Sequence, residues 1–97
     1  MKQDLDEVHS LLVGTWEVIT HNDIPQTQKL IYKFSKESEI IQFESGRQIL
    51  NNYELQEAGT FSIFTEQETK FIEAIGLNWM VITKASKFYV LKRVVQP

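Results

Sequence analysis

The chain has 97 residues, of which 42% are hydrophobic and 24% charged, a composition typical of a folded globular protein of one domain. A formal net charge of −3 argues against nucleic acid and anionic lipid surfaces as partners. The absence of cysteine excludes disulfides, a thiolate nucleophile and a zinc site built on sulfur. We therefore predict one domain over residues 1–97 that is stabilised by packing and hydrogen bonds.

The N-terminus lacks the apolar core of a secretory signal, and no apolar run approaches the roughly 20 residues of a membrane span. We expect a soluble, cytoplasmic protein without a membrane span. A mature exported domain cloned without its signal would have the same sequence, so export stays an alternative. Between residues 3 and 13, apolar side chains recur every three to four positions, which predicts a short helix. These side chains are Leu5, Val8, Leu11 and Leu12, and Gly14 ends the helix.

After Gly14 the sequence changes to runs of six to nine β-branched and aromatic residues, separated by Gly, Ser, Asn or charged pairs. This pattern is typical of strands. The predicted strands are Thr15–His21, Gln28–Ser35, Glu39–Glu44, Arg47–Leu55, Thr60–Thr65, Thr69–Ile75, Asn78–Thr83 and Lys87–Val95.

Most links between these strands are short enough for antiparallel hairpins and too short for parallel crossovers. The longer link, His21 to Thr27, contains Pro25 and is interpreted as a loop at one barrel mouth. Closure into a barrel removes exposed sheet edges. The sequence therefore predicts an all-β fold, an eight-stranded antiparallel up-and-down β-barrel with a short N-terminal helix.

The segment Leu12–Val18, with its Gly14-Thr15-Trp16 core, resembles the opening of the calycin superfamily, where a short helix leads into Gly-x-Trp. Further segments occur in the order and spacing of compact bacterial lipocalin-like domains, namely Ile31–Ser35, Asn52–Leu55, Trp79–Thr83 and Phe88–Arg93. The chain is much shorter than the large lipocalins and lacks their cysteines. The resemblance therefore implies a lipocalin-like barrel with little interior room.

The same resemblance implies a structural signature of Gly14, Trp16 and Arg93. In the superfamily the Trp seals the closed end of the barrel, and a basic residue of the last strand lies across its ring. Trp16 and Arg93 occupy the matching positions, with Lys92 as the competing candidate. A guanidinium over an indole face contributes about 0.5–2 kcal/mol, so the pairing is physically sound.

An eight-stranded barrel is wide enough either to be filled by its own side chains or to hold one small ligand. Bulky inward residues favour a filled or very small interior here, while the tyrosine hydroxyls could orient the polar end of a ligand. We predict a small apolar or amphipathic ligand as one function. The candidate ligand-binding residues are Tyr32, Phe34, Tyr53, Phe61 and Tyr89.

The alternative function is a protein-interaction or self-associating module with a solid barrel. Both faces of the strand around Trp79 are apolar, so either Trp79 with Val81 or Met80 with Ile82 can be buried. We expect Trp79 in the core. An outer strip of Trp79 or Met80 with Phe88 and Val90 would serve a homodimer.

No chemistry-bearing constellation accompanies these patterns. His9 and His21 are the two histidines, and each is expected to be solvated or locally hydrogen-bonded rather than a metal ligand. Glu73 is the carboxylate in an apolar run and is expected on the outer face. The glycines lie in separate turns and form no phosphate-binding loop. We therefore expect no enzymatic activity, no catalytic residue, no metal and no cofactor.

Overall fold

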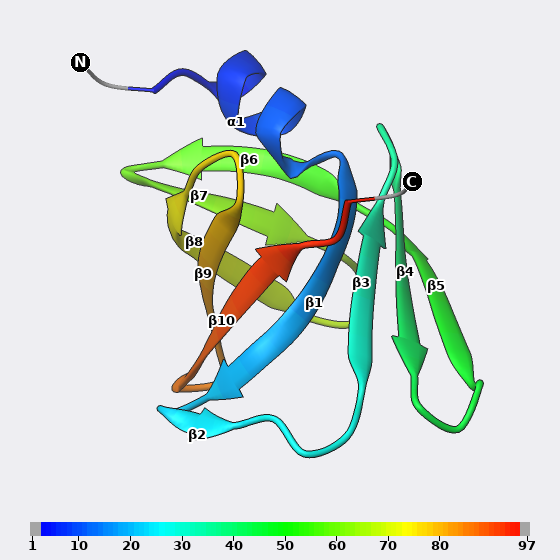
Figure 1. The fold of residues 1–97 in the computed structure, drawn as a ribbon. Coiled ribbons are helices and arrows are strands. Elements are labelled where there is room, and N and C mark those ends of the chain that lie inside the picture. Colours follow the sequence, from blue (N-terminus) through cyan, green and yellow to red (C-terminus); the bar gives the residue numbers. More distant parts are fainter. Residues whose placement is uncertain (1–2, 96–97) are drawn as a thin grey trace.

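In a computed structural model that describes residues 3–95, the chain forms one short helix and a curved sheet of ten strands (Figure 1). The helix α1 spans Leu5–Leu12. The strands are β1 Gly14–His21, β2 Ile24–Pro25, β3 Leu30–Phe34, β4 Ser38–Phe43, β5 Gln48–Asn52, β6 Glu54–Ala58, β7 Thr60–Phe64, β8 Thr69–Ile75, β9 Trp79–Lys84 and β10 Lys87–Arg93.

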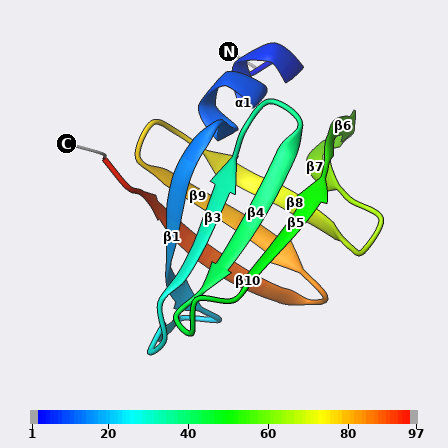
Figure 2. The same ribbon diagram turned by 90° about the vertical axis from the view of Figure 1, so that its right-hand side faces the viewer.

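The sheet is an antiparallel meander that curls until its first and last strands pair. Its order is β5-β4-β3-β1-β10-β9-β8-β7-β6, with β2 paired to β1. In the β1–β10 ladder Trp16 faces Arg93 and Val18 faces Leu91. The two ends of this order, β5 and β6, follow each other in the chain without pairing across the sheet. The result is a nearly closed antiparallel barrel (Figure 2).

The predicted count of eight strands is wrong by two, and the first difference is a strand that divides. The predicted strand Arg47–Leu55 pairs with β4 up to Asn52 and with β7 from Glu54 onward. Tyr53 lies at the switch, where its backbone N–H donates to the carbonyl of Glu37 at 3.0 Å. The second half also continues to Ala58, past the predicted end.

The second difference is β2, which lies in the segment predicted as a loop. Asn22 and Asp23 have φ angles of 51° and 65°, the left-handed conformations that a two-residue type I′ turn requires. The turn folds Ile24 and Pro25 back onto His21 and Thr20. The segment is therefore a tight hairpin on β1.

Helix α1 begins at an N-cap, Asp4, whose side chain accepts a hydrogen bond from the backbone N–H of Glu7 at 2.8 Å. Its apolar face buries Val8 and Leu12 against the barrel. The helix lies over one end of the barrel, called here the closed end (Figure 1). At the opposite end, called the open end, β1 finishes at His21 and the β4–β5 and β9–β10 hairpins turn; among residues 3–95 no helix covers it.

Strand alternation places the core inside the barrel as the sequence predicted for most strands. In β9 the inward face differs from the expected one. Met80 and Ile82 are buried, whereas Trp79 is 51% exposed on the outer face. The expectation of Trp79 in the core is therefore wrong. Met80 pairs with Leu91 of the inward face of β10, and this register decides which of the two apolar faces is buried.

Candidate functional site

The closed end is sealed by the predicted pair of Trp16 and Arg93. Trp16 is fully buried, and its indole N–H donates to the carbonyl of Leu12 at 2.9 Å, in the last turn of α1. The Arg93 guanidinium lies 4.2 Å from the centre of the indole ring. This stacked cation joins the last strand to the helix-to-strand junction, while Lys92 is exposed.

Arg93 also ties β10 to two other segments, the end of α1 and the β8–β9 link, through three carbonyl oxygens. Its guanidinium donates to Val13 at 3.1 Å, to Leu11 and to Leu77. Gly14 has a φ of +140°, which L side chains rarely adopt, and a Cβ there would meet the Arg93 guanidinium. The glycine of the Gly-x-Trp motif therefore makes room for Arg93.

Three of the predicted ligand-binding residues meet in the core. The rings of Tyr32 and Phe34 stack with centres 6.1 Å apart, and Tyr53 meets Phe34 edge-on at 5.6 Å. All three are buried in the apolar core cluster. They contact each other, and Phe34 and Tyr53 lie toward the closed end.

The Tyr53 hydroxyl is anchored beneath helix α1. It donates to the carbonyl of Ser35 at 2.6 Å and lies 3.1 Å from Nε2 of His9. The same Nε2 is 2.9 Å from the carbonyl of Lys36, which can only accept, so Nε2 carries the proton. His9 is thus locally hydrogen-bonded. Burial, followed by the charge of Glu39, raises the pKa of Tyr53 to about 12.

The other two candidate residues lie apart from this group. Phe61 is at the start of β7, on the closed-end side, and packs partly buried against the core. Tyr89 is near the start of β10 at the open end, where its ring stacks on His21 with centres 4.7 Å apart. The structure therefore brings Tyr32, Phe34 and Tyr53 together and separates Tyr89 from Phe34 and Tyr53 along the barrel.

A buried ion pair crosses the barrel interior. Lys70 of β8 and Glu39 of β4 are both fully buried, and the Lys70 ammonium donates to both carboxylate oxygens of Glu39, at 3.0 and 3.1 Å. Lys70 also lies 5.6 Å from the centre of the Tyr32 ring. Charges in such a place are costly unless they are paired, and a purely structural core needs none.

Two further charges extend the pair toward the open end. Lys70 contacts Glu68 at 2.8 Å, and Glu68 contacts Lys84 at 3.4 Å. Partial burial acts to raise the pKa of Glu68, but the hydrogen bond and charge of Lys70, with those of Lys84, outweigh it and lower the pKa. Glu39, Lys70, Glu68 and Lys84 thus form a line of alternating charges from the core to the rim.

Burial, together with the nearby negative charges of Glu39 and Glu68, raises the pKa of Tyr32 far above its usual value. Its phenol is therefore neutral at physiological pH.

The open end contains a polar atom without a partner. Nε2 of His21 is buried and has no hydrogen-bond partner among the described residues. The His21 ring stacks on Tyr89, and the Lys84 ammonium lies 5.8 Å from the centre of the Tyr89 ring. A buried polar atom without a partner is unusual in a folded protein.

At the same end of the barrel, a groove of about 600 Å³ lies between the β2–β3 link and the β4–β5 hairpin. Its apolar walls are Leu30 and Phe43, which face each other in the β3–β4 ladder and pack partly buried against the core. The Arg47 guanidinium lies 4.5 Å from the centre of the Phe43 ring. The open end therefore combines apolar walls with polar groups.

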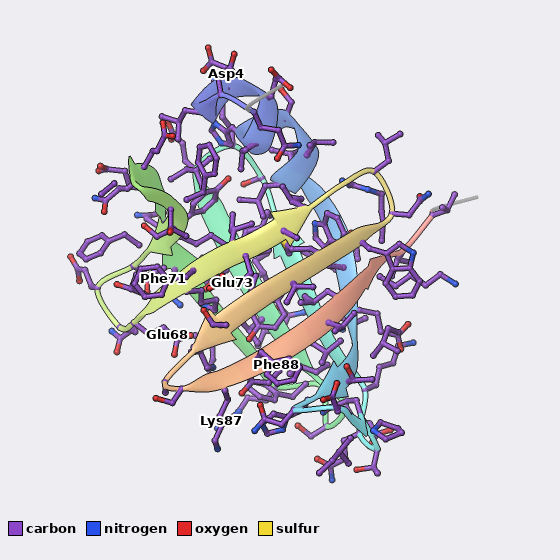
Figure 3. All side chains as sticks on the ribbon, turned by 90° about the vertical axis from the view of Figure 1, so that its left-hand side faces the viewer. Asp4, Glu68, Phe71, Glu73, Lys87 and Phe88 are labelled. Atoms are coloured by element: carbon purple, nitrogen blue, oxygen red, sulfur yellow. The ribbon has the colours of Figure 1, made fainter. Side chains whose placement is uncertain are left out.

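The described residues offer little for other chemistry. Within residues 3–95 no three His, Asp or Glu side chains converge as metal ligands. Glu73 lies on the outer face, as expected (Figure 3), and accepts a hydrogen bond from the Thr83 hydroxyl at 3.0 Å. No helix in this part of the chain has the length and apolar character of a membrane span.

The sequence analysis did not predict that Glu39 and Lys70 are buried. The alternation of side chains along their strands nevertheless indicated it. Glu39 shares a strand face with Ile41, and Lys70 shares one with Ile72, and both isoleucines are buried. When a charged residue alternates with buried residues along a strand, either the strand's inward face has been wrongly predicted or the charge is buried beside an opposite charge. Only the fold reveals that two such residues, 31 positions apart in the chain, lie within hydrogen-bonding distance.

No protein-family model and no curated protein matches the sequence. The crystal structure of an uncharacterized protein from Bacteroides eggerthii DSM 20697 has a similar fold, with a TM-score of 0.65. The match covers 86% of this chain and 99% of that chain, at 15% sequence identity. At this identity the similarity supports the fold alone, and function must be argued from the site.

Proposed function

We propose that the protein is a non-enzymatic, lipocalin-like barrel that binds a small amphipathic molecule at its open end. The apolar part of the ligand contacts Leu30 and Phe43, and its polar group approaches His21 and Tyr89. The observation that carries this proposal is the buried, unpartnered Nε2 of His21. Concave sites with apolar walls and a few convergent polar groups are the usual form of small-molecule sites.

The line of charges supports the same assignment. Glu39 and Lys70 satisfy one another in the core, while Lys84 lies at the rim beside Tyr89. Lys and Glu side chains are almost never fully buried unless they are paired. Their alternating signs compensate each other, so a ligand head group that forms hydrogen bonds fits better than one that carries a strong charge.

Affiliation with the calycin superfamily is part of the proposal. It rests on the α1-to-β1 junction at Gly14, on Trp16 beneath the helix and on Arg93 across the indole ring. An end sealed in this way leaves the opposite end for ligand entry.

The proposal is tested by calorimetric titration with two probes, decanol as a neutral amphiphile and decanoate as its anionic counterpart, both below their aggregation concentrations. We expect saturable binding of one molecule per chain, with decanol at least as tight as decanoate. His21→Phe keeps the stacked ring but removes Nε2, and it should weaken decanol binding about tenfold, the value of one neutral hydrogen bond.

Trp79→Ala is the matched control, because it removes an exposed aromatic ring from the outer face of β9. It should leave the affinity unchanged. Absence of saturable binding by both probes, or equal binding by wild type and His21→Phe, would contradict the proposed site.

A further inference from the structure

Strand β5 has one unpaired edge. β5 ends the sheet order, and among residues 3–95 no strand pairs with it on the side away from β4. Two backbone hydrogen bonds show which residues of β5 bond to β4. The Phe43 N–H donates to the carbonyl of Arg47, and the Tyr53 N–H donates to the carbonyl of Glu37. In an antiparallel ladder hydrogen-bonded pairs alternate with non-bonded ones, so the odd-numbered residues of β5 bond to β4.

The even-numbered residues of β5 therefore direct their backbone groups outward. Gln48, Leu50 and Asn52 each present an N–H and a C=O along the free edge. Leu50 is also 67% exposed on the outer face. Natural edge strands are usually protected by a charge, a proline or a bulge, and Gln48–Asn52 contains neither a charge nor a proline.

We propose that this edge pairs with the same edge of a second copy of the chain, antiparallel and about a two-fold axis at Leu50. Leu50 then faces Leu50 of the second copy, and Gln48 faces Asn52. Each facing pair exchanges two backbone hydrogen bonds, because all three residues have their N–H and C=O groups on the free side. The edge is self-complementary, as a two-fold interface requires.

Charge complementarity at the ends of the edge favours the second copy as occupant. In this register Arg47 faces Tyr53 of the other copy, next to Glu54. A groove of about 500 Å³ lies between this end of β5 and the β7–β8 link, and its described lining includes Glu54 and Glu66 but no cationic residue. Each copy therefore places its Arg47 beside the groove of the other copy that Glu54 and Glu66 line. The two-fold axis repeats this contact.

Cysteine cross-linking tests this register, since the chain contains no cysteine. In a bonded antiparallel pair the Cα atoms are about 5.5 Å apart, within the range of a disulfide. Leu50→Cys should therefore form a disulfide-linked dimer under mild oxidation. Gln48→Cys is the matched control, because the two copies of residue 48 lie about 13 Å apart in this register and should not cross-link.

Sedimentation velocity of the untagged chain across a concentration series supplies the second readout. We expect a concentration-dependent dimer that Leu50→Lys converts to monomer, since it places two like charges opposite each other. Leu77→Lys, which replaces another strongly exposed leucine, should leave the dimer intact.

Three results would overturn the proposal. The first is a wild-type chain that sediments as a monomer at every concentration, which would show that the β5 edge does not pair with a second copy. The second is a dimer that Trp79→Lys abolishes and Leu50→Lys does not, which would locate the interface on the outer face of β8–β10. The third is equal cross-linking of Leu50→Cys and Gln48→Cys.

Discussion

At the scale of single residues, the unusual feature is a charged pair at the centre of a small core. Glu39 and Lys70 are both fully buried, and each depends on the other because water cannot solvate either. Such a pair is retained at a cost in desolvation, and a well-packed apolar replacement is often neutral or stabilising. The pair therefore contributes polar groups to the barrel interior, and stability alone does not explain its presence.

Removing one partner of this pair should be far more damaging than removing both. Lys70→Met leaves the Glu39 carboxylate buried and uncompensated, and should lower the free energy of unfolding by about 3–5 kcal/mol. The double variant Glu39→Leu/Lys70→Met should recover most of that loss. Urea denaturation measures both effects, and a double variant no more stable than Lys70→Met would contradict this interpretation.

Arg93 is predicted to contribute strongly to stability because it combines ring stacking with bonds to three carbonyls. Arg93→Met keeps the apolar stem but loses the cation and its donors, and should cost about 2–4 kcal/mol in urea unfolding. Lys92→Met, at the exposed neighbouring position, should change the free energy by less than about 0.5 kcal/mol. Equal effects at the two positions would show that the guanidinium contacts carry little energy.

Tyr53 should make stability fall at alkaline pH. Its raised pKa means that the folded state favours the neutral phenol, so its contribution is complete below about pH 10, the unfolded pKa, and is lost as pH rises toward about 12. Tyr53→Phe should be about 1–2 kcal/mol less stable at pH 7, through the lost bond to Ser35. That difference should shrink between pH 10 and pH 12 in urea titrations. A constant difference over this range would contradict the assigned cause.

At the scale of elements, alternation and turn residues predicted the meander but not its interruptions. The expected closure between the first and last strands is present, with Trp16 facing Arg93. The division at Tyr53 was invisible, because the chain stays extended there while its hydrogen-bonding partner changes from β4 to β7. The error at Trp79 has a different cause, since both faces of β9 are apolar and periodicity alone cannot choose between them.

The turn between β1 and β2 depends on two residues with positive φ angles, Asn22 and Asp23. Asn22 accepts a hydrogen bond from the Phe88 N–H at 2.9 Å, whereas Asp23 holds φ at 65°. Asp23→Gly removes the steric cost of that conformation and should stabilise the fold by about 0.5–1 kcal/mol, while Asp23→Ala should destabilise it. Thermal unfolding ranks the three proteins, and an Ala variant as stable as the Gly variant would contradict the turn assignment.

At the scale of the whole molecule, the two ends of the barrel are chemically different. The closed end is covered by α1 and tied down by Trp16 and Arg93. The open end has no helix among residues 3–95 to cover it, and it combines the groove at Leu30 and Phe43 with the polar atoms of His21. This asymmetry is the basis of the proposed function. The proposed dimer edge on β5 begins next to Arg47, which also lines this groove.

The most direct test of this account is an isotope-filtered NOE experiment on the labelled protein with unlabelled decanol. We expect contacts from the alkyl chain to the Leu30 methyl groups and the Phe43 ring, and none to Val8 or Leu12 beneath the helix. Contacts confined to Leu77 and Trp79 on the outer surface, or no contacts under saturating conditions, would contradict a ligand site at the open end.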